Sequence, residues 1–119
     1  MIRRMETGKT MSRATVHNGV VYFGGHVAAG RQPTMAGQAG ALLKRYEELL
    51  KQYGSDKDHI IFACIYVTDL ALKDEFNAVW DAWLSPGCAP ARVCVACGLA
   101  EGYLVEMTLT AEQIAAPEE

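Results

Sequence analysis

The stretch SRATVHNGVVYFGG, residues 12–25, contains the clearest local signal in the sequence: two extended segments joined by Asn18-Gly19. Asn-Gly is the favoured pair for a two-residue type I′ turn, because both central residues of that turn take a positive φ. The stretch therefore predicts a β-hairpin. It ends at Gly24-Gly25, where the absence of side chains lets the backbone approach another group closely.

An amphipathic helix is predicted after this hairpin, over residues 34–53. Pro33 and Thr34 suit its start, and Gly54 suits its end. Residues 59–67 follow as a nearly continuous apolar run, which is typical of a strand buried on both faces. The apolar residues of the helix recur at three- and four-residue steps and form one stripe: Met35, Ala39, Leu42, Leu43, Tyr46, Leu49, Leu50 and Tyr53.

The second half of the sequence predicts another helix and a second hairpin. Residues 72–84 have an apolar side and stop at Ser85-Pro86-Gly87. Residues 92–97 and 103–110 alternate like strands and would be joined by residues 98–102. The order ββαβαββ predicts an α+β domain whose two helices cover one face of a sheet. The other face must meet solvent, a ligand or another subunit.

Composition and charge narrow the functional classes. The chain has 119 residues, half of them hydrophobic, which predicts a single domain with an N-terminal segment at 1–10 and an acidic tail at 112–119. A net charge of −3 and a pI of about 5.6 argue against nucleic-acid or anionic-membrane partners. Residues 1–13 lack the apolar core of a secretion signal, and the longest apolar run, 60–67, is far below the roughly 20 residues of a membrane span. We therefore expect a cytoplasmic protein.

The cysteines and histidines do not predict a metal centre. Cys94 and Cys97 form a C-x-x-C, but residues three apart on a strand point to opposite faces. The three histidines are scattered without metal-ligand spacing. We expect free thiols and no bound metal.

The expected final hairpin would gather reactive side chains on its polar face. If the apolar residues of both strands share the core face, then Arg92, Cys94 and Glu106 share the other face. In that register Cys94 lies opposite Glu106, with Arg92 on the diagonal. An ordinary cross-strand ion pair on a solvent-exposed face of the sheet explains the same pattern. The residues alone therefore leave a functional site and a surface ion pair open.

Several blocks of the sequence resemble, in order, the Rid family of reactive intermediate deaminases, also known as the YjgF type. APARVCVAC (89–97) followed by YLVEM (103–107) is similar to the family pattern Pro-Ala-Arg-x-x-Val and its aliphatic-x-Glu strand. VYFGGHV (21–27) and FNAVWDAW (76–83) resemble its second strand and its second helix. The resemblance runs from about residue 11 to residue 111 and is closest to a shorter subgroup.

The resemblance implies a chorismate-mutase-like subunit within a homotrimer whose sheets pack into a barrel, with sites in the clefts between subunits. It implies hydrolysis of reactive enamines and imines of 2-amino acids, which gives a 2-oxo acid and ammonia. Neither a cofactor nor a metal is implied. The partners would be small 2-imino acids, with no nucleic acid and no membrane.

The resemblance also implies roles for five residues. Arg92 matches the carboxylate-binding arginine, and its planar fork suits bidentate binding of a carboxylate. Glu106 matches the glutamate that positions the attacking water, with general base as a further role. Cys94 and Gly25 match positions whose backbone lines the site. Asn77 matches a helix asparagine close to it.

Three positions depart from the family pattern. Met11 stands where a tyrosine is usual, Gly24 where a serine or threonine is usual, and His26 where a glutamine is usual. The lost hydroxyls remove hydrogen-bond donors, which would loosen the orientation of a substrate that Arg92 still holds. Because Met11 makes the pocket more apolar, we predict a preference for larger or more hydrophobic imino acids over 2-aminoacrylate.

Two other functions remain open. A ribonuclease or translation inhibitor is a label that some relatives carry, but the acidic pI and the lack of a basic, aromatic groove argue against it. A non-catalytic ligand sensor or chaperone-like trimer would keep Arg92 and bind small carboxylates without turnover. Sequence does not separate the latter from an enzyme, because binding and catalysis would share the same arginine.

Overall fold

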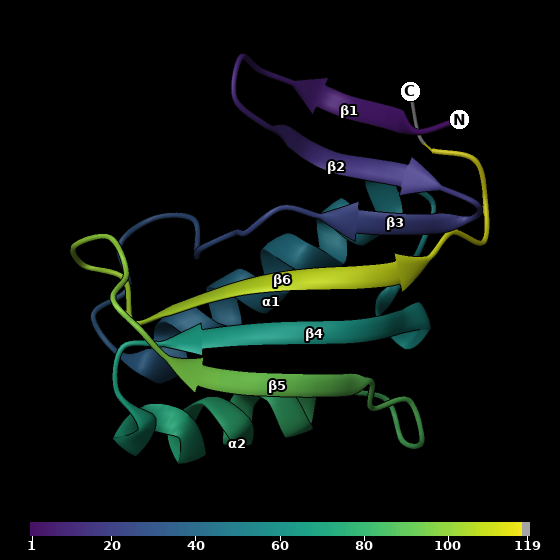
Figure 1. The fold of residues 1–119 in the computed structure, drawn as a ribbon. Coiled ribbons are helices and arrows are strands. Elements are labelled where there is room, and N and C mark those ends of the chain that lie inside the picture. The colour runs from purple at the N-terminus through teal and green to yellow at the C-terminus, as the bar shows by residue number, and fades with distance from the viewer. Residues whose placement is uncertain (118–119) are drawn as a thin grey trace.

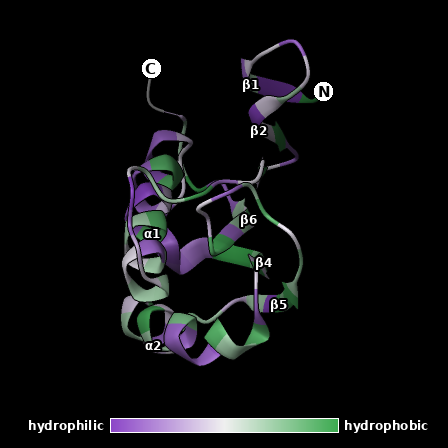
Figure 2. Cartoon of the chain, turned by 90° about the vertical axis from the view of Figure 1, so that its left-hand side faces the viewer, coloured by the Kyte–Doolittle hydropathy of each residue, from purple (hydrophilic) through white to green (hydrophobic). Residues whose placement is uncertain are grey.

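The computed structural model describes residues 1–117 and shows a six-stranded sheet with two helices packed on one of its faces (Figures 1 and 2). This arrangement confirms the α+β class. Two short 3₁₀ turns, η1 (Lys57–His59) and η2 (Leu70–Leu72), precede β4 and α2. The strands and helices are β1 (Arg3–Thr7), β2 (Ser12–His17), β3 (Val20–Phe23), α1 (Met35–Gln52), β4 (Ile60–Val67), α2 (Lys73–Trp83), β5 (Ala91–Ala96) and β6 (Val105–Glu112).

The first hairpin and the long helix form as their local signals predict. Asn18 and Gly19 both have positive φ, at 51° and 76°. The Thr34 side chain caps α1 by accepting a hydrogen bond from the Gly37 amide at 3.0 Å, and Gly54 follows the helix with φ of 84°. All eight residues of the predicted apolar stripe are buried, with Tyr46 and its neighbours against the sheet. The capping residues therefore predict where α1 begins and ends, and the helical periodicity predicts which of its faces is buried.

The N-terminal segment and the C-terminal tail are more structured than the sequence indicates. Residues 3–7 form β1, which pairs antiparallel with β2 and adds a strand to the predicted order. Its sequence, RRMET, has no apolar alternation, so its extended form depends on pairing with β2. The predicted tail begins inside β6, and the amides of Ile114 and Ala115 donate to the Gly54 carbonyl. Residues 118–119 of that tail lie outside the described part of the chain.

The final hairpin expected from the sequence is wrong. The strand order is β1-β2-β3-β6-β4-β5, so β4 lies between β5 and β6. β5 pairs with β4 in parallel, and β6 pairs with β4 antiparallel. The eight residues that separate β5 from β6, 97–104, exceed the two to five residues of a typical hairpin loop, and they cross the end of β4.

This topology places Arg92 and Glu106 on opposite faces of the sheet. Arg92 pairs with Ala63, which is fully buried beneath the helices, whereas Glu106 pairs with the half-buried Tyr66 on the open face. Paired residues of adjacent strands point to the same side. The convergence of Arg92, Cys94 and Glu106 expected from the sequence is therefore wrong within one chain, because it assumed that β5 and β6 are neighbours.

The face of the sheet away from the helices carries exposed apolar side chains. The prediction that β4 is buried on both faces is also wrong, since its second face is uncovered. The apolar pattern of β5 was expected to face the core, but Val93 and Val95 point away from the helices. The exposed large residues of the open face and its edge are Tyr22 (47%), Ile61 (47%), Phe62 (40%), Val93 (40%) and Val95 (38%).

Neither helix of residues 1–117 combines the length and the hydropathy that crossing a membrane requires.

Candidate functional site

Arg92 is anchored to α2 from the edge strand β5. Its Nη2 donates a hydrogen bond of 2.6 Å to Oδ1 of Asn77. The guanidinium carbon also lies 5.9 Å from the ring centre of Phe76 and 5.7 Å from that of Trp80. Asn77 and both rings belong to neighbouring turns of one helix, so α2 positions the whole group. The arrangement combines a charge-assisted hydrogen bond with cation–π contacts.

The remaining donors of Arg92 are available to a ligand. Among residues 1–117 its guanidinium makes no other side-chain hydrogen bond and no ion pair. The side chain is half-buried at the edge of the sheet. Cys94 lies two residues further along the same face of β5, half-buried and packed against the core as a free thiol. The structure therefore joins three predicted site residues, Arg92, Cys94 and Asn77, in one group, which we call the arginine cluster.

Glu106 lies against the backbone of Gly25. A Cβ atom built on Gly25 would clash with Oε2 of Glu106, so only glycine permits this approach without moving the carboxylate. The close approach that the sequence predicts at Gly24-Gly25 is therefore made to the glutamate. The carboxyl group is half-buried on the open face of β6.

Met11 lies beside the same glycine pair. A Cβ atom on Gly24 would stand 3.2 Å from Cε of Met11, which is tighter than ordinary packing. Met11 is exposed and lines a cavity of about 420 Å³ together with Gly25 and His26. We refer to Met11, Gly24, Gly25 and Glu106 as the glutamate cluster. Since β4 lies between β5 and β6, a single chain does not bring the two clusters together.

A buried histidine and tyrosine hold the glycine pair in place. The sequence marks His26 only as a departure from the family pattern and Tyr46 only as part of the apolar stripe. His26 Nδ1 lies 2.8 Å from the Gly24 carbonyl oxygen, and the Tyr46 hydroxyl donates to the Met107 carbonyl at 2.6 Å. Burial lowers the pKa of His26, more than its bond to Gly24 raises it. Burial raises the pKa of Tyr46. Both side chains are therefore neutral at pH 7.

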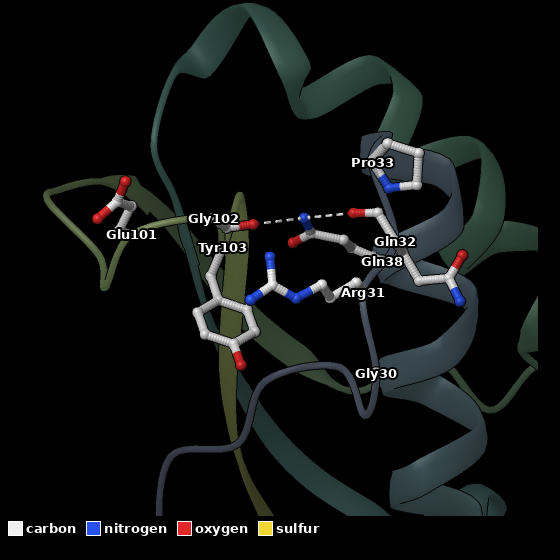
Figure 3. Close-up of a pocket in the computed structure, with 8 residues that line it drawn as sticks. All are labelled: Gly30, Arg31, Gln32, Pro33, Gln38, Glu101, Gly102 and Tyr103. Atoms are coloured by element: carbon white, nitrogen blue, oxygen red, sulfur yellow. Dashed lines mark hydrogen bonds between the residues drawn. The ribbon is translucent and has the colours of Figure 1, made fainter.

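A second cavity, of about 460 Å³, lies between residues 30–33 and the loop 101–103 (Figure 3). The buried amide of Gln38 ties these loops together: Nε2 donates to the carbonyls of Gln32 and Gly102, both at 2.9 Å, and Oε1 accepts from the Leu104 amide at 2.7 Å. The signal that could have identified Gln38 is a polar residue within an apolar helical stripe. None of the predicted site residues lines this cavity.

The fold is that of a class of small α+β proteins represented among solved structures. The crystal structure of NMB1025, a YjgF-family protein from Neisseria meningitidis, is 37% identical, covers 98% of both chains and has a TM-score of 0.91. A protein of the Rid family from Yersinia pestis, YyfA, is 23% identical with a TM-score of 0.85 over 94% of this chain and 99% of that one, and it supports the fold alone.

Sequence comparison defines the family. The model of the Endoribonuclease L-PSP family matches residues 1–113. The RutC family protein YoaB of Escherichia coli K12 is 32% identical over 114 residues, covering 92% of this chain and 96% of YoaB. A RutC family protein of Haemophilus ducreyi is 30% identical over 93% of this chain and 96% of its own length. The chain belongs to this family, which includes the YjgF, RutC and Rid proteins, and the resemblance seen in its sequence is confirmed.

Proposed function

We propose that the protein hydrolyses reactive 2-imino and enamine acids to 2-oxo acids and ammonia. The observation that carries the proposal is the anchoring of Arg92, whose guanidinium is fixed by Asn77 and two aromatic rings while its other donors stay free. A pre-positioned planar fork binds a carboxylate bidentately with little loss of side-chain entropy. Family membership supports this class of substrate.

Glu106 would act on the water that attacks the imine carbon. As water adds across the C=N bond, its carboxylate takes one proton from the water and passes it to the imine nitrogen, and the resulting carbinolamine carries a hydroxyl and an amino group on one carbon. The same carboxylate then transfers the hydroxyl proton to the amino group, so that the C–N bond breaks, ammonia leaves and the C=O of the 2-oxo acid forms. Contact with Gly25 limits the positions open to the carboxylate. No step requires a cofactor.

The complete site would form between subunits of a homotrimer. Arg92 of one subunit would meet Glu106 and Gly25 of the next, since one chain presents them on opposite faces. An interface that joins two different surfaces of the same chain closes into a ring when the rotation between subunits divides a full turn evenly, as in a trimer. The exposed apolar side chains of the open face, including Phe62, Val93 and Val95, are of the kind that subunit contacts cover.

The test is ammonia release from imino acids that an amino-acid oxidase generates in the same solution. Wild type should accelerate release and Arg92→Ala should not. The control Arg31→Ala removes an exposed arginine at the cavity between residues 30–33 and 101–103, and it should behave like wild type. Equal rates for wild type and buffer over a broad panel of imino acids would contradict the proposal. The preference for larger apolar imino acids, predicted from Met11, is read from the same panel.

Carboxylate binding without turnover is the second candidate, and one observation favours it. Arg92 is ordered by its own subunit through Asn77, whereas Glu106 is not near it in the same chain. A protein with only the arginine cluster intact would still bind a small carboxylate. Calorimetry with a stable 2-oxo acid tests this alternative. It is favoured if wild type binds the acid, Arg92→Ala does not, and wild type releases no ammonia from imino acids.

A further inference from the structure

The segment Gly24–His26 is attached to β6 by backbone and side-chain hydrogen bonds. The His26 amide donates to the Met107 carbonyl and the Met107 amide donates to the His26 carbonyl, both at 3.0 Å. The Tyr46 hydroxyl from α1 donates to the same Met107 carbonyl at 2.6 Å. Met107 directly follows Glu106, so three hydrogen bonds fix the backbone beside the candidate catalytic carboxylate.

The His26 side chain fixes the backbone on the other side of Gly25, at Gly24. Since a carbonyl oxygen can only accept, His26 Nδ1 carries the proton and donates to Gly24 at 2.8 Å. The Tyr46 hydroxyl lies 3.2 Å from the same nitrogen, and the two rings make an edge contact with centroids 5.2 Å apart. His26 is 7% exposed, so this bond has little competition from solvent. Gly25, which touches the Glu106 carboxylate, is thereby held between two anchored residues.

We infer that His26 and Tyr46 are positioning residues that hold the carboxylate of Glu106 in its working orientation, an inference that rests on the proposed function. The contact runs from the His26–Tyr46 pair to Gly24 and Met107, and from there to Gly25 and Glu106. Neither side chain touches the carboxylate. Their loss should therefore change the orientation of Glu106 while Arg92 continues to bind the substrate.

The first variant is Tyr46→Phe, which removes one hydroxyl and keeps the ring in the core. A small misplacement of a catalytic group lowers the rate by up to about a hundredfold, so we expect kcat to fall by about ten- to a hundredfold. KM should stay within about twofold, because the substrate carboxylate is held elsewhere. Tyr53→Phe is the matched control: it removes a buried hydroxyl at the end of the same helix, where the partner is Glu6. That control should keep the wild-type kcat.

The second variant pair separates the hydrogen bond from the imidazole itself. His26→Ala should show the same loss of kcat as Tyr46→Phe. His26→Gln should recover most of it, because its amide can still donate to the Gly24 carbonyl. Recovery by glutamine, together with an unchanged KM, distinguishes positioning from a general loss of structure, and unfolding curves establish that each variant is folded.

A readout without substrate separates this inference from the proposed function. The ¹³C resonance of the Glu106 carboxyl should move in Tyr46→Phe and stay unchanged in Tyr53→Phe. If it moves as expected but wild type releases no ammonia, the proposed function is wrong and the positioning of Glu106 stands. If the resonance is the same in both variants, or if folded Tyr46→Phe keeps its kcat within about twofold, the inference is overturned.

Discussion

Arg92 has aromatic rings beneath it and an amide oxygen beside it, and no carboxylate of residues 1–117 forms an ion pair with it. This environment orders the guanidinium without neutralising its charge, because Asn77 is neutral and the rings of Phe76 and Trp80 offer only their π-faces. A salt bridge in the same place would compete with any anionic ligand. The residue is therefore ordered in advance and still free to bind.

Asn77→Ala tests this arrangement. Loss of the 2.6 Å hydrogen bond should let the guanidinium leave the rings and raise the Kd for a small 2-oxo acid by about five- to tenfold, which corresponds to about 1 kcal/mol, the usual net contribution of one hydrogen bond. Calorimetric titration measures this change in Kd. Asn18→Ala, in the β2–β3 turn, serves as the asparagine control. An unchanged Kd would show that Asn77 is not needed to order the arginine.

His26 predicts a pH dependence of stability with a defined sign. Burial lowers its pKa in the folded state, so below its ordinary value of about 6.5 the unfolded chain binds more protons than the folded one. Stability should therefore be fully present above that value and fall as pH drops through the window beneath it. The charged groups that act on His26 in the fold are Arg45, Arg13 and Glu6.

Denaturant unfolding of wild type and His26→Gln at pH values on both sides of about 6.5 measures this contribution. Wild type should lose more stability on acidification than His26→Gln. His59 contributes with the opposite sign, since a hydrogen bond to Asp56 raises its pKa and favours the folded state at low pH. Both proteins share His59, so it cancels in the comparison. Equal losses in the two proteins would contradict a neutral buried His26.

At the scale of elements, the sequence predicts the helices and turns that nearby residues determine, and it misses the strand positions that depend on pairing with distant strands. The boundaries of α1 follow from Thr34, Gly54 and the spacing of its apolar residues, which all lie within the helix or next to it. The position of β5 depends on its pairing with β4, which is 24 residues or more away in sequence. No local motif in either strand indicates this pairing. The extended form of β1 likewise depends on β2.

The same distinction applies to the candidate site. The residue types of both clusters could be found from motifs, because Arg92 and Glu106 stand in recognisable blocks of sequence. Their separation onto two faces could not, since it results from the insertion of β4 between their strands. The pairing of His26 with Tyr46 was missed because the sequence marks the first only as a departure from the family pattern and the second only as a core residue of the helix, and only the fold brings them together.

Two glycines within α1 give a stability prediction at this scale. Gly40 is exposed and a Cβ atom there would meet nothing within 4 Å, so Gly40→Ala should stabilise the protein by about 0.5–1 kcal/mol. Gly37 is the matched control, because its Cβ would stand 3.1 Å from both Gln32 Oε1 and Thr34 Oγ1. Gly37→Ala should gain less, since crowding at the helix cap offsets the propensity. Urea unfolding compares the two, and an equal gain would contradict this account of the cap.

At the scale of the whole molecule, a site shared between subunits predicts complementation between two inactive variants. Arg92→Ala and Glu106→Gln should each lack activity alone. After unfolding and refolding together in equal amounts, about a quarter of the interfaces in a ring should combine an intact Arg92 with an intact Glu106. Ammonia release at roughly that fraction of wild type is expected. A mixture as inactive as its components would place both residues in the same subunit's site.

The place of β6 in the sheet has a consequence for how the chain is made. β6 is the last strand in sequence, yet it alone joins β3 to β4, so the sheet consists of two separate halves until residues 105–112 arrive. A chain made from its N-terminus therefore contains both halves before it contains the strand that joins them. Until residues 105–112 have emerged, the edges of β3 and β4 that β6 covers are both unpaired, and the sheet cannot close.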